Sequence, residues 1–326
     1  MRQILRNIKN RLHLEKHYLK ECYIFWQKTR KYNASNHTIQ DKEKMQYTLL
    51  RLIHTIEKGM SMKNPRRGFG QAKVLNIIKE LNIYVDRYLD KDKVFLYEPM
   101  STVEAYIKYT LNSGVEIPEI EEKFAALKKR VGFEGLSYEG GVKEVSKQAI
   151  LEKCNKDFES LLYSRHSIRY FTNTILSKDI IDKALTLASR TPSACNRQGW
   201  KTHVYQGNKC TELLTWQGGA RGFEKDIHNA ILVTANLKAF LSYEIHQAYI
   251  DGGLYAMNLI NALHSLGLGT IPLSCGFEEN KLKRLEEFGV SENEVPIVII
   301  GFGELPRNFK IAVSNRKDIA ITNTYH

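Results

Sequence analysis

The chain has 326 residues, of which 43% are hydrophobic, and a formal net charge of +12 at pH 7. This length is enough for one large or two ordinary domains, and this apolar content can fill their cores. The most apolar segment, Leu254 to Leu273, is interrupted by Asn258, Asn261 and His264, which argues against a membrane-spanning helix. Five cysteines show neither CxxC spacing nor a His/Cys cluster, so a disulfide framework and a bound metal are not expected.

The N-terminal segment, residues 1–31, is basic and amphipathic. Residues 1–150 carry 28 Lys+Arg and 18 Asp+Glu, a net charge of +10, whereas residues 151–326 carry 20 and 18, a net charge of +2. Apolar residues recur in the segment at near-helical spacing: Ile4, Leu5, Ile8, Leu12 and Leu14. The favoured interpretation is a solvated helix face over an apolar stripe, and the alternative is contact with an anionic membrane surface or an acidic partner. Nucleic-acid binding is disfavoured because no recognition motif accompanies the charge.

The same segment lacks the apolar core and the small-residue cleavage site of a secretory signal. We therefore expect a cytoplasmic protein, with peripheral attachment to a membrane surface as the alternative that the basic helix leaves open.

Helical periodicity predicts helices over residues 47–60, 72–88 and 119–131. Between the first two lies a basic, Gly-rich segment ending at Gly70, which predicts a turn, with contact to an anionic ligand as the alternative. Gly132 to Gly141 predicts a linker, after which helix formers resume from Val142 to Tyr163. The expected division is a mostly helical accessory domain, 1–150, followed by a second domain, 151–326.

A short motif, Ser164 to Phe171, contains two arginines and a hydroxyl that can converge on one phosphate. Arg165 and Arg169 offer fork-shaped donors, and Ser167 lies between them. A helix end with solvated arginines is the alternative interpretation of this motif taken alone.

A second motif follows after one predicted amphipathic helix that starts at Ser177 and ends at Pro192. Its sequence, Pro-Ser-Ala-Cys-Asn-Arg-Gln over residues 192–198, combines small residues with a hydroxyl and two amides. Such a turn can direct hydrogen-bond groups at the edge of a planar ligand. Cys195, in this motif, and Cys275 are both expected to be buried small hydrophobes, with a redox-active thiol as the alternative.

Further segments follow in a fixed order: Asp251-Gly252-Gly253, Asn258-Leu259, residues 265–270, residues 272–277, a strand at 296–304 and residues 314–317. With the two motifs, they resemble the nitroreductase family of FMN-dependent oxidoreductases over roughly residues 155 to 320. The resemblance and the β-rich runs at 203–206, 230–236 and 296–303 imply an α+β fold. Its central mixed or antiparallel sheet would be covered by helices.

The resemblance also implies roles for individual residues. The FMN phosphate would be held by the segment of Arg165, His166, Ser167 and Arg169, and by Arg316. The ribityl chain and ring edge would be bound by Pro192, Ser193, Asn196 and Gln198. A loop of Pro272, Ser274, Cys275 and Gly276 would place a backbone N–H near flavin N5. The chain departs from the family at Ser314, where many relatives have lysine, and at Ser274 to Gly276, where some have an acidic residue and glycine.

The activity implied is transfer of hydride from NADH or NADPH through flavin to an electron-poor acceptor such as a nitroaromatic, quinone or enone. The flavin itself carries this chemistry, so no catalytic side chain is assigned. The resemblance further implies a homodimer in which both subunits form each flavin pocket. Two alternatives remain: an FMN enzyme with a dedicated biosynthetic substrate, of the surface-polysaccharide type, and a non-catalytic adaptor that docks through its basic N-terminal helices.

Overall fold

The computed structural model describes the chain except for residues 1, 33–41, 90–91, 134–138, 242–243 and 278. The chain forms two compact units, which are described separately. The first contains residues 1–36 and 146–307, and the second contains residues 37–145 and 308–326.

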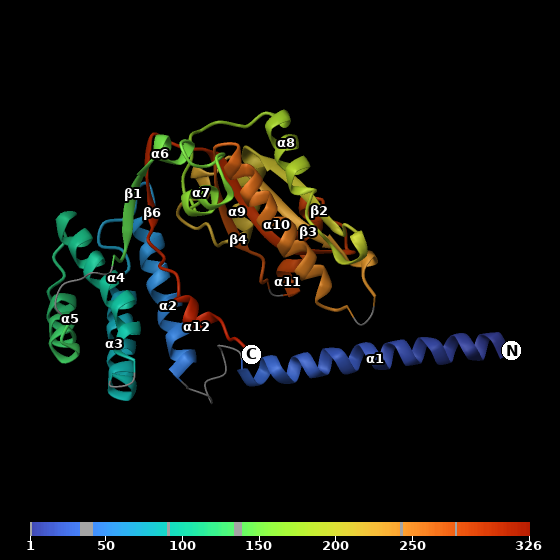
Figure 1. Ribbon diagram of the computed structural model, residues 1–326, viewed down its shortest axis with the longest axis horizontal. Helices are drawn as coiled ribbons and strands as arrows, with labels where there is room; N and C mark the ends of the chain where they lie inside the picture. The colour runs from blue at the N-terminus through green and yellow to red at the C-terminus, as the bar shows by residue number, and fades with distance from the viewer. Residues whose placement is uncertain (1, 33–41, 90–91, 134–138, 242–243, 278) are drawn as a thin grey trace. The chain divides into compact units, whose positions relative to one another are not determined.

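The first unit is built on a four-stranded antiparallel sheet with the strand order β2-β3-β5-β4 (Figure 1). The strands are β2 (Trp200–Gln206), β3 (Asn229–Asn236), β4 (Leu268–Ser274) and β5 (Glu294–Glu304). Every residue of β3 from Asn229 to Ala235 is buried. A strand buried on both faces reads as a continuous apolar run, which explains why its sequence does not alternate.

Two helices, α8 (Lys178–Ala188) and α10 (Gln247–Ser265), pack together against one face of this sheet. Their shared core includes Ile181, Leu259, Leu263 and, from the sheet, Ile231 and Phe302. The other helices of the unit are α1 (Arg2–Tyr32), α6 (Lys147–Leu151), α7 (Phe158–Ser164), α9 (Asn208–Gln217) and α11 (Glu279–Leu282). Short 3-10 turns cover 194–196, 224–226, 237–239 and 283–288.

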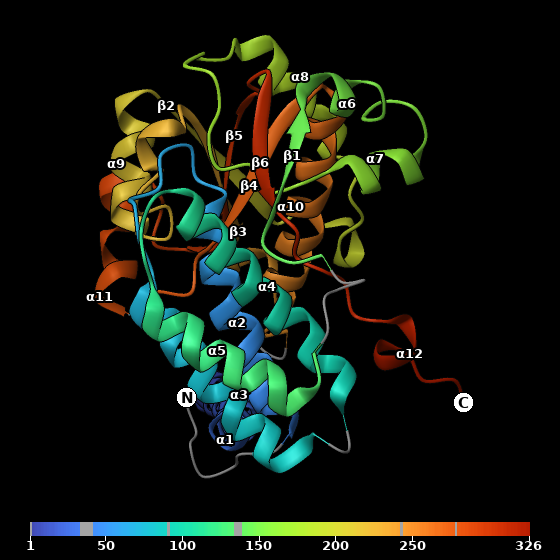
Figure 2. The ribbon, with the colours of Figure 1, turned by 90° about the vertical axis from the view of Figure 1, so that its left-hand side faces the viewer.

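The second unit is mostly helical. It contains α2 (Lys42–Met60), α3 (Gln71–Tyr88), α4 (Lys93–Asn112), α5 (Pro118–Val131), the short α12 (Ile319–Thr322) and a two-stranded sheet of β1 (Val142–Ser146) with β6 (Asn308–Ala312). Helix α2 packs against α3 and α4, and α3 packs against α5 (Figure 2). Phe69, in the segment after α2, packs its ring against Gly59 near the end of that helix. A Cβ on Gly59 would lie 2.1 Å from the ring, so only glycine fits at this position.

The predicted α+β class is confirmed, with an antiparallel sheet in the first unit. The helices predicted in the front half are present, within a few residues at their N-termini. The helix formers expected from Val142 to Tyr163 form α6 and α7 over part of that range, but 142–146 is a strand that pairs with β6. The compact units also differ from a division at residue 150, since that pairing brings the C-terminal segment into the helical unit. The predicted linker from Gly132 to Gly141 lies partly outside the described residues.

Candidate functional site

The first motif is an extended segment attached to strand β4. Helix α7, whose N-cap Asp157 accepts from the Ser160 N–H at 2.8 Å, ends at Ser164, and Arg165 is already extended. Ser167 forms a parallel bridge with Thr270 of β4, and the Ile168 N–H donates to the Thr270 carbonyl at 2.9 Å. Successive side chains in an extended segment point to opposite sides. The side chain of Ile168 is buried and anchors the segment, so the side chain of Ser167 points to the opposite side.

The two arginines of this motif differ in burial. Arg169 is only 3% exposed, and Arg165 is half-buried. A solvated helix end therefore does not describe Arg169. On the neighbouring strand, the Thr270 hydroxyl is buried and has no hydrogen-bond partner among the described residues. A buried hydroxyl in that position requires a partner, which a bound polar ligand or a water molecule can supply.

His264, near the C-terminal end of α10, is a titratable residue that the sequence analysis did not single out. Its Nε2 lies 2.9 Å from the Ser164 hydroxyl, directly before the first motif. Burial, with a smaller contribution from the charge of Arg165 and against a hydrogen bond to the backbone at Leu268, lowers the pKa of His264 to about 4. The ring is therefore neutral at pH 7, and the positive charge in this region resides on the arginines.

The second motif forms a turn in an unusual backbone conformation. Cys195, Asn196 and Gln198 have φ values of 50°, 52° and 50°, in the left-handed region that side chains with a Cβ rarely adopt. The Ser193 hydroxyl accepts from the Gln198 N–H at 2.9 Å, which closes the turn. Several such residues in succession cost free energy, and they persist where the surroundings impose them, often at ligand sites.

Two side chains of helix α10 hold the turn in this conformation through hydrogen bonds. Asn258 donates to the Thr191 hydroxyl at 2.7 Å, at the start of the motif. Asp251, which is 1% exposed, accepts from the Ala194 N–H at 3.2 Å and from Gln247 at 2.7 Å. The motif residues Asp251 and Asn258 thus fix the turn, and their spacing of seven places them on the same face of the helix.

Arg197 attaches the turn to residues 239–244. Its guanidinium forms a bidentate ion pair with Glu244, with both N–O distances 2.7 Å, and its Nη1 also donates to the Ala239 carbonyl. The hydrogen bonds from Arg197 lower the pKa of Glu244 to about 2. This pair is structural, and it leaves the remaining side chains of the turn to face outward.

Pro192, Asn196 and Gln198 are exposed, and Ser193 is half-buried. The side chain of Cys195 is exposed as well. The expectation that Cys195 is buried is therefore wrong, because the left-handed backbone turns the residue outward from the packed helix below it.

The third predicted segment lies at the end of β4. Pro272 and Ser274 belong to the strand and are exposed, so the predicted loop begins only at Cys275. Proline is compatible with β4 because β4 is an edge strand. Gln217 of α9 donates to the Ser274 carbonyl at 2.9 Å, and a Cβ on Gly276 would meet no atom within 4 Å. The backbone at Gly276 therefore borders open space.

Cys275 is half-buried, and burial raises its pKa to about 12. Its thiol is therefore protonated at pH 7, which disfavours a nucleophilic role.

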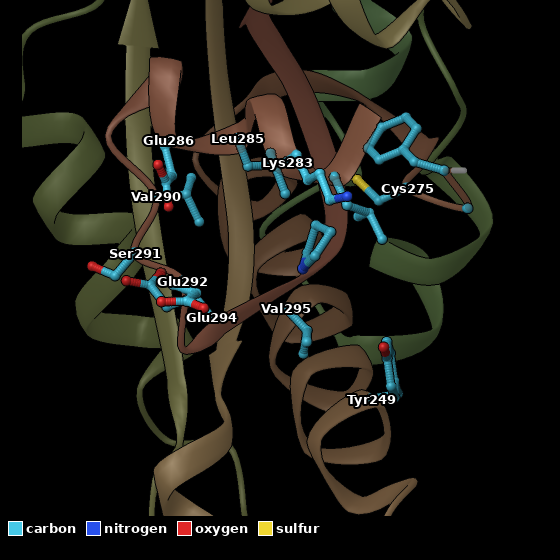
Figure 3. Close-up of a pocket in the computed structure, with 14 residues that line it drawn as sticks. Tyr249, Cys275, Lys283, Leu285, Glu286, Val290, Ser291, Glu292, Glu294 and Val295 are labelled. Carbon is cyan, nitrogen blue, oxygen red and sulfur yellow. The ribbon is translucent and has the colours of Figure 1, made fainter. Parts of the chain in front are cut away.

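Two pockets flank this loop. One, of about 620 Å³, is lined by Cys275, Gly276, Tyr249 and Glu294 among others, and Figure 3 shows Cys275 and Glu294 on its opposite sides. The second, of about 530 Å³, is lined by Ser274, Gly276, Gln217 and Lys281 among others. Both volumes are in the range of small-molecule sites. Because Ser167 pairs with Thr270 of β4, the first motif and this loop lie along one strand.

Glu294 is a further residue that the sequence analysis did not single out. Its side chain is 1% exposed and accepts from Lys201 at 2.7 Å, His203 at 2.7 Å and Thr234 at 2.6 Å. Burial raises the pKa of Glu294, but these hydrogen bonds outweigh it and lower the pKa to about 2. Its partners come from two other strands, so no local sequence pattern could have revealed the cluster.

Arg316, the last predicted phosphate ligand, belongs to the second unit, where its Nη1 donates to the Ser314 carbonyl at 3.0 Å. Ser314 has a left-handed backbone, and its hydroxyl donates to the buried Glu57 carboxylate at 3.2 Å. Ser314, at the position where many relatives have lysine, thus has a structural role in this chain, because its hydroxyl attaches the C-terminal segment to α2. Its consequence for a phosphate remains a prediction.

These features define an α+β protein with a strained turn and two pockets on one antiparallel sheet. Residues 162–242 match the model of the nitroreductase family. A protein of Archaeoglobus fulgidus, provisionally named an NADH dehydrogenase/NAD(P)H nitroreductase, is 30% identical over 157 residues, which are 47% of this chain and 86% of that protein. A protein of Methanothermobacter thermautotrophicus with the same provisional name is 25% identical over 49% of this chain and 79% of its own length.

Among solved structures, a provisionally assigned NAD(P)H:FMN oxidoreductase of Staphylococcus epidermidis has a TM-score of 0.46 and 20% identity. The match covers 52% of this chain and 96% of that one. The chain belongs to the nitroreductase family, through a region in its C-terminal half. Among the described residues, no helix is long and apolar enough to cross a membrane.

Proposed function

We propose that the protein is an FMN-dependent oxidoreductase that uses NADH or NADPH to reduce an electron-poor small molecule of the nitroaromatic, quinone or enone type. Family membership supports the reaction class. The observation that carries the proposal is the turn of residues 191–198, in which three left-handed residues are fixed by Asp251 and Asn258 of α10.

The residues present are compatible with FMN. Arg165, Ser167 and Arg169 would bind the phosphate, with Arg316 as the further ligand that the family resemblance implies. Ser193, Asn196 and Gln198 would hold the ribityl chain and ring edge, and Pro192 would pack beside them. The flavin ring would lie close to the backbone between Ser274 and Gly276, and this is supported by the absence of any atom within 4 Å of a Cβ on Gly276. When bound, FMN would accept hydride from the nicotinamide and pass the electrons to the acceptor.

The chain's own residues would bind the cofactor and the substrates, orient them and exclude water from the site. His264 is neutral and hydrogen-bonded to Ser164, so it helps to position the first motif and adds no charge. His166, in the same motif, would contact the phosphate edge. Cys275 would contribute its backbone, since its thiol is protonated. No side-chain acid or base is needed for hydride transfer itself, and positioning lowers the barrier.

The visible absorption spectrum of the purified protein tests the proposal. We expect flavin bands that bleach when NADH or NADPH is added without oxygen. A protein that is colourless and takes up no FMN would contradict the proposal and favour the adaptor. Rapid bleaching without turnover of any common acceptor would favour a dedicated biosynthetic substrate.

Arg165→Ala tests the phosphate assignment. The change removes a charge-assisted hydrogen bond worth roughly 1.5–3 kcal/mol, so the dissociation constant for FMN should rise at least about tenfold. The dissociation constant can be measured by flavin fluorescence titration. Arg190→Ala is the matched control, because Arg190 is exposed at the end of α8 and outside the motif. Equal affinity in both variants would show that Arg165 does not bind the phosphate.

A further inference from the structure

Helix α1 is a single long helix of 31 residues (Figure 1). Its sequence places two sets of side chains along it. We define the apolar stripe as Ile4, Ile8, Leu12, Leu19, Tyr23 and Trp26, which follow one another at spacings of three, four or seven. We define the basic stripe as Arg6, Lys9, Lys16 and Lys20, which repeat at the same spacings. At about 100° per residue, each set occupies its own side of the helix.

The apolar stripe is exposed. Each of its six side chains has between 49% and 66% of its surface accessible to solvent. In α2, by contrast, Leu49, Ile53 and Ile56 are at most 2% exposed. The solvated helix face that the sequence interpretation favoured is exposed, and the apolar stripe is exposed as well. Apart from Glu15, which lies between Leu12 and Leu19 on the same side of the helix, the stripe is apolar, and an exposed apolar surface of this kind indicates an interaction site.

The charge of α1 identifies the chemistry of the partner. Nine basic and two acidic residues give the helix a net charge of +7. One of the acidic residues, Glu15, pairs with Arg11 at 3.1 Å. A second copy of so basic a helix would be repelled. A nucleic acid would use the charge and leave the apolar stripe in water.

We propose that α1 binds an anionic lipid surface and lies in its interface. The apolar stripe would enter the boundary between headgroups and acyl chains, and the basic stripe would remain at the anionic headgroups. Tyr23 and Trp26, stacked with ring centroids 5.6 Å apart, provide the amphipathic rings that favour this depth. The helix is too polar to span a bilayer. The inference does not depend on a bound flavin.

The test uses the full chain and co-sedimentation with vesicles. Vesicles that contain phosphatidylglycerol should bind the protein, and vesicles of phosphatidylcholine alone should bind it far more weakly. Lys9→Gln/Lys16→Gln/Lys20→Gln should weaken binding roughly a hundredfold, because each lysine near the surface adds about fivefold. Lys73→Gln/Lys129→Gln/Lys153→Gln is the matched control, since these lysines are exposed outside α1.

A second variant tests the apolar stripe at constant charge. Ile8→Ser/Leu12→Ser/Leu19→Ser should weaken binding at least about tenfold through lost apolar burial. Val94→Ser/Ile175→Ser/Leu187→Ser should not, although its three side chains are comparably exposed. Circular dichroism of each variant verifies that the helices remain.

Three outcomes would overturn the proposal. The first is that the full chain does not bind the anionic vesicles. The second is that binding depends on the lysines and not on the apolar stripe, which indicates general polyanion attraction. The third is that the serine variant binds vesicles as the wild type does but has a lower mass in light scattering, which indicates that a second copy covers the stripe.

Discussion

His264 shows how burial can set the charge of a side chain. Its pKa is lowered to about 4, below that of an unfolded histidine. The unfolded chain therefore binds a proton between pH 6.5 and 4 that the folded chain does not bind. The folded state loses stability as the pH falls through this range, and above pH 6.5 the residue contributes no pH dependence.

The prediction at this scale is a comparison of wild type with His264→Gln. Between pH 7 and pH 5, the wild type should lose about 2 kcal/mol of unfolding free energy that the variant does not lose. Urea unfolding at both pH values measures the difference. Glu98 opposes the trend, because burial raises its pKa to about 7, but it is present in both proteins and cancels. Identical pH dependence in the two proteins would show that His264 is not buried in the neutral form.

At the scale of the element, α10 organises the first unit. It packs against the sheet and α8, holds the 191–198 turn through Asp251 and Asn258, and places His264 behind the first motif. Its consecutive glycines, Gly252 and Gly253, differ in their surroundings. A Cβ on Gly252 would lie 2.6 Å from Ile297 of β5, whereas a Cβ on Gly253 would meet nothing within 4 Å.

Gly252→Ala should therefore destabilise the protein by about 1–3 kcal/mol, because the helix must move away from β5. Gly253→Ala should leave stability unchanged or raise it by up to about 1 kcal/mol, since alanine favours the helix interior. Thermal unfolding of the pair provides the comparison. Equal effects of the two substitutions would mean that α10 does not approach β5 closely at Gly252.

At the scale of the whole molecule, a dimer remains a prediction, and α10 exposes apolar residues that such an interface would bury. Tyr249, Ile250, Leu254 and Met257 are between 42% and 52% exposed. Leu254→Asp should convert a dimer to a monomer in light scattering, because a buried carboxylate without a partner is costly. Leu187→Asp on α8, at a similarly exposed leucine, is the control. A wild-type monomer, or a dimer that persists in Leu254→Asp, would exclude this face.

The two motifs and the α+β class were predictable because each depends on local chemistry: periodic apolar residues, turn formers and paired arginines. Ser177 illustrates the limit of such reasoning. It does occupy the N-cap of α8, but its side chain makes no capping hydrogen bond. The strand β1 was predicted as helix, because its pairing with β6 joins segments about 165 residues apart and leaves no local trace.

The sequence by itself determined the family, the α+β class and the amphipathic character of α1, since motif order, composition and periodicity are local properties. Only the tertiary structure decided that the apolar stripe of α1 is exposed, that Cys195 faces solvent, and that Glu294 and His264 are buried with their partners. Burial depends on which segments meet in space. The same side chain can be solvated or enclosed according to neighbours that lie far away in the chain.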